Sequence, residues 1–180
     1  MNDGVIWITG LSASGKTTLA KNLAELLKAS NSPHVLLDGD ELRKCFNAQQ
    51  QYSKKERLSL SYNYSRISKM ISEQNIIVVI AVVALFEEVH IWNRQNINNY
   101  FEVFLNTPKK ELERRDPKKI YKKFRQGEIN NVSGYDLEVD YPNNPDFLVD
   151  FEPSKSSEEV AKEVFHNFMN YKKLRTTIDN

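Results

Sequence analysis

The chain has 180 residues, of which 40% are apolar and 27% charged, and its formal net charge is +1. This length suffices for one domain with a full hydrophobic core but not for two such domains, so we expect a single domain over residues 1–180. Because the charges nearly balance, no overall field favours nucleic acid or a membrane surface, and we expect neither as a partner.

Apolar runs and cysteine content indicate the compartment. The longest apolar run, residues 76–86, is far shorter than the roughly 20 residues of a membrane-spanning helix, and we find no basic and apolar leader. Cys45 is the single cysteine and has no partner for an internal disulfide, so we expect a buried or half-buried thiol in a reducing compartment. Together these features predict a cytoplasmic protein.

The apolar pattern alternates between the spacing of strands and that of helices. Residues 5–9 are continuously apolar, as in a buried parallel strand, and leucines at helical spacing follow Lys16. The β-branched run 75–83 is too dense for a half-exposed strand and should lie inside the sheet. The expected strands are 5–9, 34–40, 75–83, 100–106 and 147–151, and the longer expected helices follow Lys16, span 54–73 and span about 156–173. This alternation predicts an α/β fold with a five-stranded parallel sheet and helices on both faces.

One polar segment, about residues 108–145, separates the fourth expected strand from the fifth. Its residues 109–125 hold nine lysines and arginines against three acidic residues, a local net charge of +6. The positive charge of the chain is therefore concentrated here, and an anion is the natural partner of this segment.

The stretch "GLSASGKTT", residues 10–18, has the spacing of the phosphate-binding P-loop and predicts a P-loop NTPase fold. It follows an expected strand and opens an expected helix, so consecutive backbone N–H groups at the helix N-terminus can bind phosphate. We expect Lys16 to reach the β- and γ-phosphates of ATP and act in catalysis, and Thr17 to bind Mg²⁺ through its hydroxyl. The expected ATP-binding residues of this loop are Gly10, Leu11, Ser12, Ala13, Ser14, Gly15, Lys16, Thr17 and Thr18.

A P-loop alone is compatible with a GTPase, a motor ATPase or a metabolite kinase. The DxxG and NKxD motifs of Ras-type GTPases are absent from the sequence, and residues 76–83 end without the acidic residue expected of a motor. Of the three classes, the small-molecule kinase is the one that these absences leave open. Its acceptor hydroxyl needs a carboxylate that orients it and accepts its proton, and we expect Asp40 of "DGD" to take this catalytic role. Alternatively, Asp38 and Asp40 cap a helix that begins at Glu41.

Several longer motifs resemble those of the adenylylsulfate kinases, which phosphorylate the ribose 3′-hydroxyl of adenylyl sulfate with ATP. The similarity spans residues 4 to about 150 and rests on "VIWITGLSASGKTTLA", "LLDGDELR", "FEVFLNTP" and "RDPKKIYKKFRQGEINNVSGYD". It implies that residues 108–145 are a mobile basic lid that closes over both nucleotides, with Arg115 near ATP and Lys122 or Lys123 near the acceptor. Such closure also expels water from the transferring group. The alternative for these lysines is a solvated helix face.

The resemblance extends only partly to the acceptor site. Arg43 and Arg57 match family positions that contact the acceptor nucleotide, and Tyr52 stands where the family has a Phe that stacks on the acceptor base. An aromatic platform of this kind can contribute about 1–3 kcal/mol. With Asp40 and the two lid lysines, these residues form the matched part of the expected acceptor-binding site.

Four further acceptor-binding positions depart from the family. Leu60 and Asn63 replace an Asn and an Arg, Ala84 lies where the family has "ISP", and Val132 replaces a second stacking Phe. Exchanging polar partners for apolar ones should change what is bound. Two readings stay open: drift within a true adenylylsulfate kinase, or a different nucleotide with a free 3′-hydroxyl. Cytidine diphosphoramidate kinase, a relative from capsule biosynthesis, fits the second, because a single-ring base needs less stacking surface than adenine.

Two other functions are compatible with a P-loop. One is a kinase for a sugar or an acid, and the other is an ATP-binding regulator that has lost catalysis. The joint presence of Lys16, Thr17 and Asp40 argues against the regulator. The resembled family commonly forms homodimers, and the sequence neither supports nor excludes a homodimer here.

Overall fold

The structure, a computed structural model, describes residues 3–50 and 52–178. One parallel sheet has the order β2-β3-β1-β4-β5 and comprises β1 (Gly4–Thr9), β2 (His34–Asp38), β3 (Ile77–Val82), β4 (Tyr100–Asn106) and β5 (Phe147–Asp150). The expected α/β fold with a five-stranded parallel sheet is thereby confirmed. β3 lies between β2 and β1 with every residue buried, as its β-branched composition predicts.

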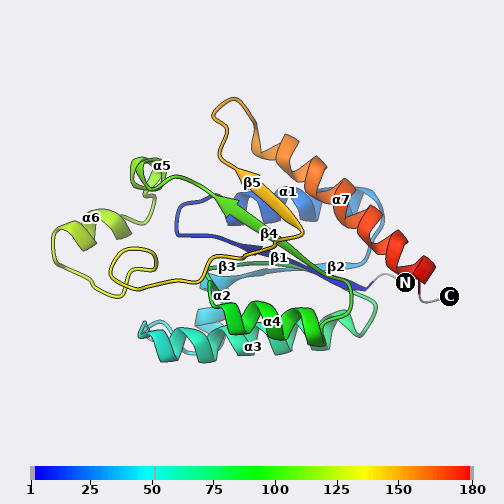
Figure 1. Cartoon of the computed structure of the whole chain (residues 1–180), viewed down its shortest axis with the longest axis horizontal. Coiled ribbons are helices and arrows are strands. Elements are labelled where there is room, and N and C mark those ends of the chain that lie inside the picture. The colour runs from blue at the N-terminus through cyan, green and yellow to red at the C-terminus, as the bar shows by residue number, and fades with distance from the viewer. Residues whose placement is uncertain (1–2, 51, 179–180) are drawn as a thin grey trace.

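Helices cover both faces of the sheet (Figure 1). α1 (Lys16–Ala29) and α7 (Ser157–Ile178) pack together on one face, and α3 (Lys54–Ser72) and α4 (Glu87–Asn96) lie side by side on the other. The short α2 (Gly39–Cys45) follows β2. α3 begins with a capping box, in which Ser53 and Glu56 each accept the backbone N–H of the other. This box fixes where α3 begins.

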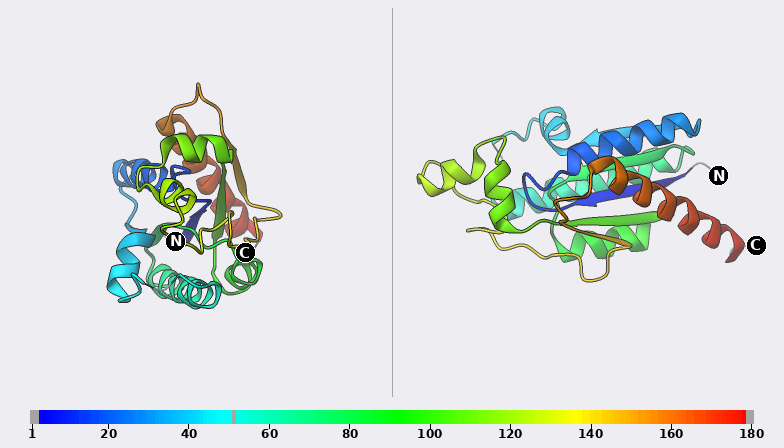
Figure 2. Two further views of the ribbon diagram at one scale, coloured as in Figure 1. Left: turned by 90° about the vertical axis from the view of Figure 1, so that its left-hand side faces the viewer. Right: turned by 90° about the horizontal axis from the view of Figure 1, so that it is seen from above.

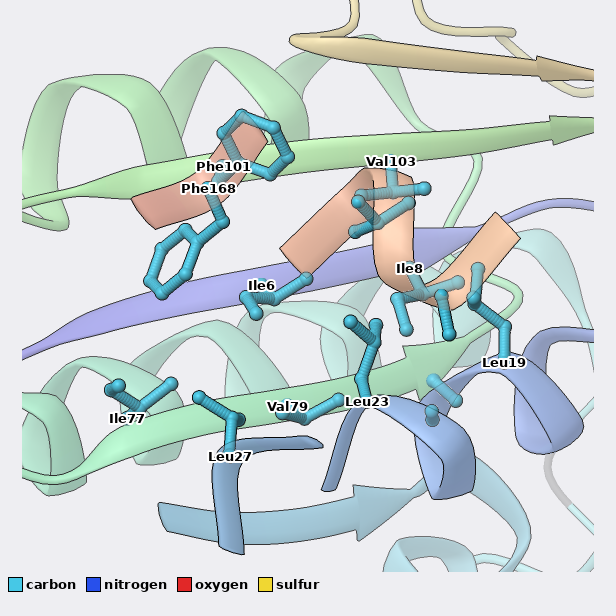
Figure 3. Packing of buried hydrophobic residues seen from close by; sticks show 14 of the residues in the cluster. Ile6, Ile8, Leu19, Leu23, Leu27, Ile77, Val79, Phe101, Val103 and Phe168 are labelled. Carbon is cyan, nitrogen blue, oxygen red and sulfur yellow. The ribbon is translucent and has the colours of Figure 1, made fainter. Parts of the chain in front are cut away.

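Apolar layers separate the sheet from its helices. Ile6 and Ile8 of β1 and Phe101 of β4 face α1 and α7, from which Leu23 and Phe168 meet them (Figure 3). Burying each of these side chains stabilises the fold by about 1.5–3 kcal/mol relative to leaving it exposed. The alternate residues of the same strands pack against α3 and α4. Because both faces are buried, the strand register is fixed. Because all five strands run parallel, their carboxyl ends meet at one edge of the sheet.

In the segment 108–145, called the lid below, residues 109–125 lie over that edge, at the end of the molecule away from the last turns of α7, and the last residues run back beside β4 to the start of β5 (Figure 1 and Figure 2). The lid includes α5 (Lys109–Arg115) and α6 (Ile120–Arg125). Tyr121 of α6 is fully buried, and its hydroxyl donates to the carbonyl oxygen of Ser12 at 2.7 Å. The lid is therefore packed on the P-loop through an apolar base that also contains Leu11 and Val132.

Two local expectations are wrong. β2 ends at Asp38, because Asp38 caps α2, which begins at Gly39 and not at Glu41. Cys45 is exposed instead of buried or half-buried, because α2 has seven residues and buries only Leu42. No helix within residues 3–50 and 52–178 is long and apolar enough to cross a membrane.

Candidate active site

The P-loop between β1 and α1 requires glycine at two positions. Gly10 has a φ of 150° and Gly15 a φ of 103°, a region that strains other residues and costs glycine little. A Cβ at Gly10 would also lie 2.9 Å from the carbonyl oxygen of Leu105, so another residue would collide with β4. These two bends bring the loop around the first turn of α1.

The N-terminus of α1 offers backbone donors to an anion. Gly15 is the N-cap, and no side chain among the described residues caps the helix there. The N–H groups of a first helical turn lack intrahelical acceptors, and with the helix dipole they form a binding site for phosphate. The P-loop therefore has the geometry that its spacing predicts.

Lys16 is 9% exposed and lies inside this loop. Its Nζ donates to the carbonyl oxygen of Leu11 at 2.7 Å and to the hydroxyl of Ser14 at 3.4 Å. Burial, and after it the charge of Lys118, lower the pKa of Lys16 from 10.5 to about 7. A phosphate chain beside this amine would favour the charged form, so binding of a polyphosphate and protonation of Lys16 are coupled.

Two carboxylates lie at the carboxyl end of β2 and take different partners. Asp38 caps α2 by accepting the N–H of Asp40 at 2.9 Å, and its second oxygen accepts the Thr17 hydroxyl at 2.7 Å. Asp40 forms an ion pair with Lys118 of the lid. The capping alternative is therefore confirmed for Asp38, which also contacts the P-loop, whereas the Asp40 carboxylate faces the lid.

The residues around Thr17 fit a magnesium ion that arrives with ATP. The Thr17 hydroxyl and the Asp38 carboxylate are oxygen ligands of the kind that Mg²⁺ accepts, and they lie together. No group of three or more His, Cys, Asp or Glu side chains in the described part of the chain could hold a metal ion by itself. Mg²⁺ in kinases usually has few protein ligands and takes the rest from phosphates and water, so a small oxygen set is sufficient.

A cavity of about 800 Å³ extends from the P-loop to the lid and the start of α3. This volume lies within the roughly 300–1,000 Å³ typical of ligand pockets. The expected site residues that line it are Ser12, Ala13, Gly15, Lys16, Thr17, Thr18, Asp40, Arg43, Tyr52, Arg57, Arg115, Lys123 and Val132. One cavity thus combines residues that the sequence assigned to ATP with residues assigned to the acceptor.

Arg115 lies at the P-loop end of this cavity. Its guanidinium donates to the carbonyl oxygen of Ser14 at 3.4 Å and lies 5.0 Å from the ring centroid of Phe151. A cation near both the P-loop and an aromatic ring is well placed for the anionic and the aromatic parts of ATP. Arg115 thus lies beside the P-loop, and its expected place near ATP stays a prediction.

Tyr52, Arg43 and Arg57 form the opposite end of the cavity. The guanidinium carbons of Arg43 and Arg57 lie 4.9 and 5.2 Å from the centroid of the Tyr52 ring. Arg57 also donates to the carbonyl oxygens of Tyr52 at 2.9 Å and of Asn131 at 2.8 Å. Burial, and after it the charge of Arg43, lower the pKa of Arg57 to about 10. Arg57 therefore links the Tyr52 segment to the lid.

Three expected ATP-binding residues do not line the cavity and instead support the P-loop. Gly10 makes the tight bend next to β4. Leu11 and Ser14 receive the hydrogen bonds of Lys16, and the Leu11 side chain joins the apolar base of the lid. These residues hold the loop in shape, and any direct contact with ATP stays a prediction.

Four expected acceptor-binding residues also lie outside the cavity lining. Leu60 and Ala84 are 3% and 0% exposed in the layer beneath α3 and α4, because apolar side chains there pack against the sheet. Asn63 is half-buried on α3, and Lys122 is exposed on α6. The structure does not bring these residues together with Tyr52, so their role in binding stays a prediction.

Sequence reasoning missed several residues of the cavity. Ser61 and Tyr64 both line it and follow Arg57 at helical spacing, so they share one face of α3, and this spacing could have revealed them. Lys118 stands inside the "RDPKK" motif, but its ion pair with Asp40 depends on how the lid folds. No local pattern contains that information.

Known proteins provide an independent comparison. Residues 2–150 match the family model described as Adenylylsulphate kinase. The cytidine diphosphoramidate kinase of Campylobacter jejuni is 36% identical over 141 residues, 78% of this chain and 82% of that protein. The adenylyl-sulfate kinase of Pseudomonas aeruginosa is 36% identical over 148 residues, 81% of this chain and 76% of that protein.

Solved structures support the same assignment. The APS kinase CysC of Mycobacterium tuberculosis, solved in complex with AMPPNP and APS, superposes with a TM-score of 0.86 and 32% identity. The match covers 93% of this chain and 98% of that one. The predicted P-loop kinase fold is therefore confirmed, and so is a phosphotransferase that acts on a hydroxyl group of its acceptor. The chain belongs to the adenylylsulphate kinase family.

Proposed function

We propose that this protein transfers the γ-phosphoryl group of ATP to the ribose 3′-hydroxyl of a nucleotide. The observation that supports this most strongly is a single cavity that connects the P-loop and Asp40 to Tyr52, Arg43 and Arg57. The P-loop and a carboxylate suit phosphoryl transfer, and an aromatic ring with two cations suits an anionic nucleotide. A sugar or acid kinase has no need of such an aromatic platform.

Each group of residues in the cavity has its own role in the proposed reaction. Lys16 and the N-terminus of α1 bind the β- and γ-phosphates and offset the charge that spreads over the transferring group. Mg²⁺, when bound, supplies further positive charge to these phosphates, with Thr17 and Asp38 as its protein ligands. Asp40 orients the acceptor hydroxyl and accepts its proton. The lid excludes water, because its apolar base lies on the P-loop and Lys118 reaches across to Asp40.

For the acceptor we propose a cytidine nucleotide such as cytidine diphosphoramidate. Val132 lines the cavity with less surface than the Phe expected for the family, so stacking depends mainly on Tyr52. A single-ring base suits this smaller stacking area. The 36% identity to the Campylobacter jejuni enzyme adds support.

Adenylyl sulfate is the second candidate acceptor. It is favoured by the likeness to the Mycobacterium tuberculosis structure, with its TM-score of 0.86 and its bound APS. Arg43 and Arg57 lie at the same end of the cavity and would suit the anionic part of either acceptor. A homodimer stays a prediction for both candidates.

The test is an ADP-release assay with purified protein, MgATP and a panel of acceptors: cytidine diphosphoramidate, CDP, adenylyl sulfate and glucose. We expect kcat/KM for cytidine diphosphoramidate to exceed that for adenylyl sulfate by about 10-fold or more. A higher kcat/KM for adenylyl sulfate would overturn the cytidine acceptor in favour of adenylyl sulfate, and the proposal of a nucleotide kinase would stand. ADP release with glucose alone, or with no acceptor of the panel, would contradict the proposed function. Lys16→Ala controls for contaminating kinases.

A further inference from the structure

Tyr64 is a cavity residue for which the mechanism above has no use. It lies on α3, two turns after Arg57, and is 5% exposed. Its ring packs near Phe46 with 6.1 Å between centroids, and it lines the same cavity as Lys16 and Asp40. A buried tyrosine usually has a hydrogen-bond partner for its hydroxyl, so the contacts of this hydroxyl bear on the chemistry of the cavity.

The Tyr64 hydroxyl has a long hydrogen bond next to the two carboxylates. It donates to the carbonyl oxygen of Gly39 at 3.4 Å, about 0.6 Å longer than a usual O–H···O bond. Gly39 separates Asp38 from Asp40, so the phenol lies next to the backbone that carries the proposed base. A hydroxyl whose bond is this long gains free energy by moving to a closer oxygen.

The phenol is a donor at neutral pH. Burial raises the pKa of Tyr64 to about 12, and Arg43 acts in the opposite direction. The hydroxyl therefore keeps its proton and can donate it to an oxygen of a bound molecule. Ser61, which lines the cavity one turn earlier, donates to the carbonyl oxygen of Arg57 at 2.8 Å, an ordinary distance. Of these two hydroxyls, only that of Tyr64 would shorten its hydrogen bond by turning to an oxygen of a bound molecule.

The reacting hydroxyl of a ribonucleotide has a neighbour on the sugar ring. If Asp40 accepts the proton of the 3′-hydroxyl, the 2′-hydroxyl lies next to it on the same face of the ribose. The residue that Tyr64 contacts, Gly39, directly precedes Asp40 in the chain. A phenol at this place can reach the second hydroxyl while Asp40 holds the first.

We propose that Tyr64 binds the acceptor by donating a hydrogen bond to the ribose 2′-oxygen, which fixes the 3′-hydroxyl against Asp40 and selects ribonucleotides over 2′-deoxynucleotides. The inference rests on the proposed function, because it requires a nucleotide acceptor. It names a residue of α3 that the motifs of the sequence did not indicate.

The experiment combines one substitution in the protein with one change in the substrate, as in a double-mutant cycle, and compares the four kcat/KM values. Wild type and Tyr64→Phe are each assayed with the acceptor that wild type phosphorylates, whether cytidine diphosphoramidate, CDP or adenylyl sulfate, and with the 2′-deoxy analogue of that acceptor. Tyr64→Phe keeps the ring and removes only the hydroxyl. Tyr62→Phe is the matched control, because Tyr62 lies on the same helix and donates a similarly long bond, 3.3 Å to Glu88, outside the cavity lining. Thermal melts of all variants check folding.

Removing either partner of the hydrogen bond should lower kcat/KM by about 3- to 10-fold, and removing both should cost no more than removing one. KM for ATP should not change in Tyr64→Phe, and Tyr62→Phe should keep the wild-type preference for the ribonucleotide. A Tyr64→Phe protein that retains the full preference would overturn the inference and leave the nucleotide kinase intact. Failure of wild type to phosphorylate cytidine diphosphoramidate, CDP and adenylyl sulfate alike would instead overturn the proposed function, and this inference with it.

Discussion

Asp40→Asn tests whether Asp40, and not Asp38, is the carboxylate of "DGD" that accepts the proton of the acceptor hydroxyl. The Asp40 side chain is 57% exposed and pairs with Lys118, so the exchange removes one exposed ion pair. Such a pair contributes about 0–1 kcal/mol, so the free energy of unfolding should change by no more than this. A positioned general base accelerates proton transfer strongly, and we expect kcat to fall by about 10²- to 10⁴-fold while KM for ATP stays nearly unchanged.

Asp38→Asn is the matched control, with the same chemical change two residues earlier. Because Asp38 accepts the hydroxyl of Thr17 at 2.7 Å and caps α2, this variant should weaken binding of MgATP and lower the melting temperature more than Asp40→Asn. Steady-state ADP release with varied ATP at saturating acceptor separates the two effects. If Asp40→Asn keeps kcat within about 5-fold of wild type, Asp40 is not the base and the reasoning is refuted.

Three further predictions concern the P-loop and the acceptor site. Gly10→Ala should lower the free energy of unfolding by about 1–3 kcal/mol, because its Cβ would lie 2.9 Å from the carbonyl oxygen of Leu105; an unchanged denaturant midpoint would contradict this. ATP binding at about pH 8 should take up as much as one proton, because Lys16, with its pKa lowered to about 7, is mostly neutral there and becomes charged beside the phosphates. Titration calorimetry in buffers of different ionisation enthalpy measures this uptake, and its persistence in Lys16→Met would rule out Lys16 as the source. Val132→Phe should raise the kcat/KM of adenylyl sulfate relative to CDP by about 5- to 100-fold through added stacking, whereas unchanged selectivity would remove Val132 from the acceptor site.

The fold could be predicted from the sequence because its signals are local and repeated. Residues 77–82 are continuously apolar and β-branched, and they form the buried strand β3. Leucines at helical spacing after Lys16 form the buried face of α1. The end of β2 was predicted two residues too late, because a single side-chain cap by Asp38 outweighs the strand pattern of the residues before it.

The candidate site could be predicted only where a short motif determines the local backbone conformation. The P-loop does so, since backbone conformation and glycine positions are encoded within nine residues. Leu60 was matched to an acceptor position by its place in the chain, yet its apolar side chain packs beneath α3, out of the cavity. The helical spacing from Arg57 contains the place of Tyr64 on α3, but the contact of Tyr64 with Gly39 and the Lys118–Asp40 pair join segments far apart in sequence, which neither composition nor spacing contains.

The position of the transferred phosphate tests the central claim most directly. Proton-coupled ³¹P NMR of the product made from MgATP and the preferred acceptor identifies the oxygen that has been phosphorylated. We predict a new phosphomonoester signal coupled to the ribose H3′ proton, with ADP formed in equal amount. A phosphate on another oxygen of the nucleotide, or ATP hydrolysis to inorganic phosphate without a phosphorylated nucleotide, would contradict a nucleotide 3′-kinase.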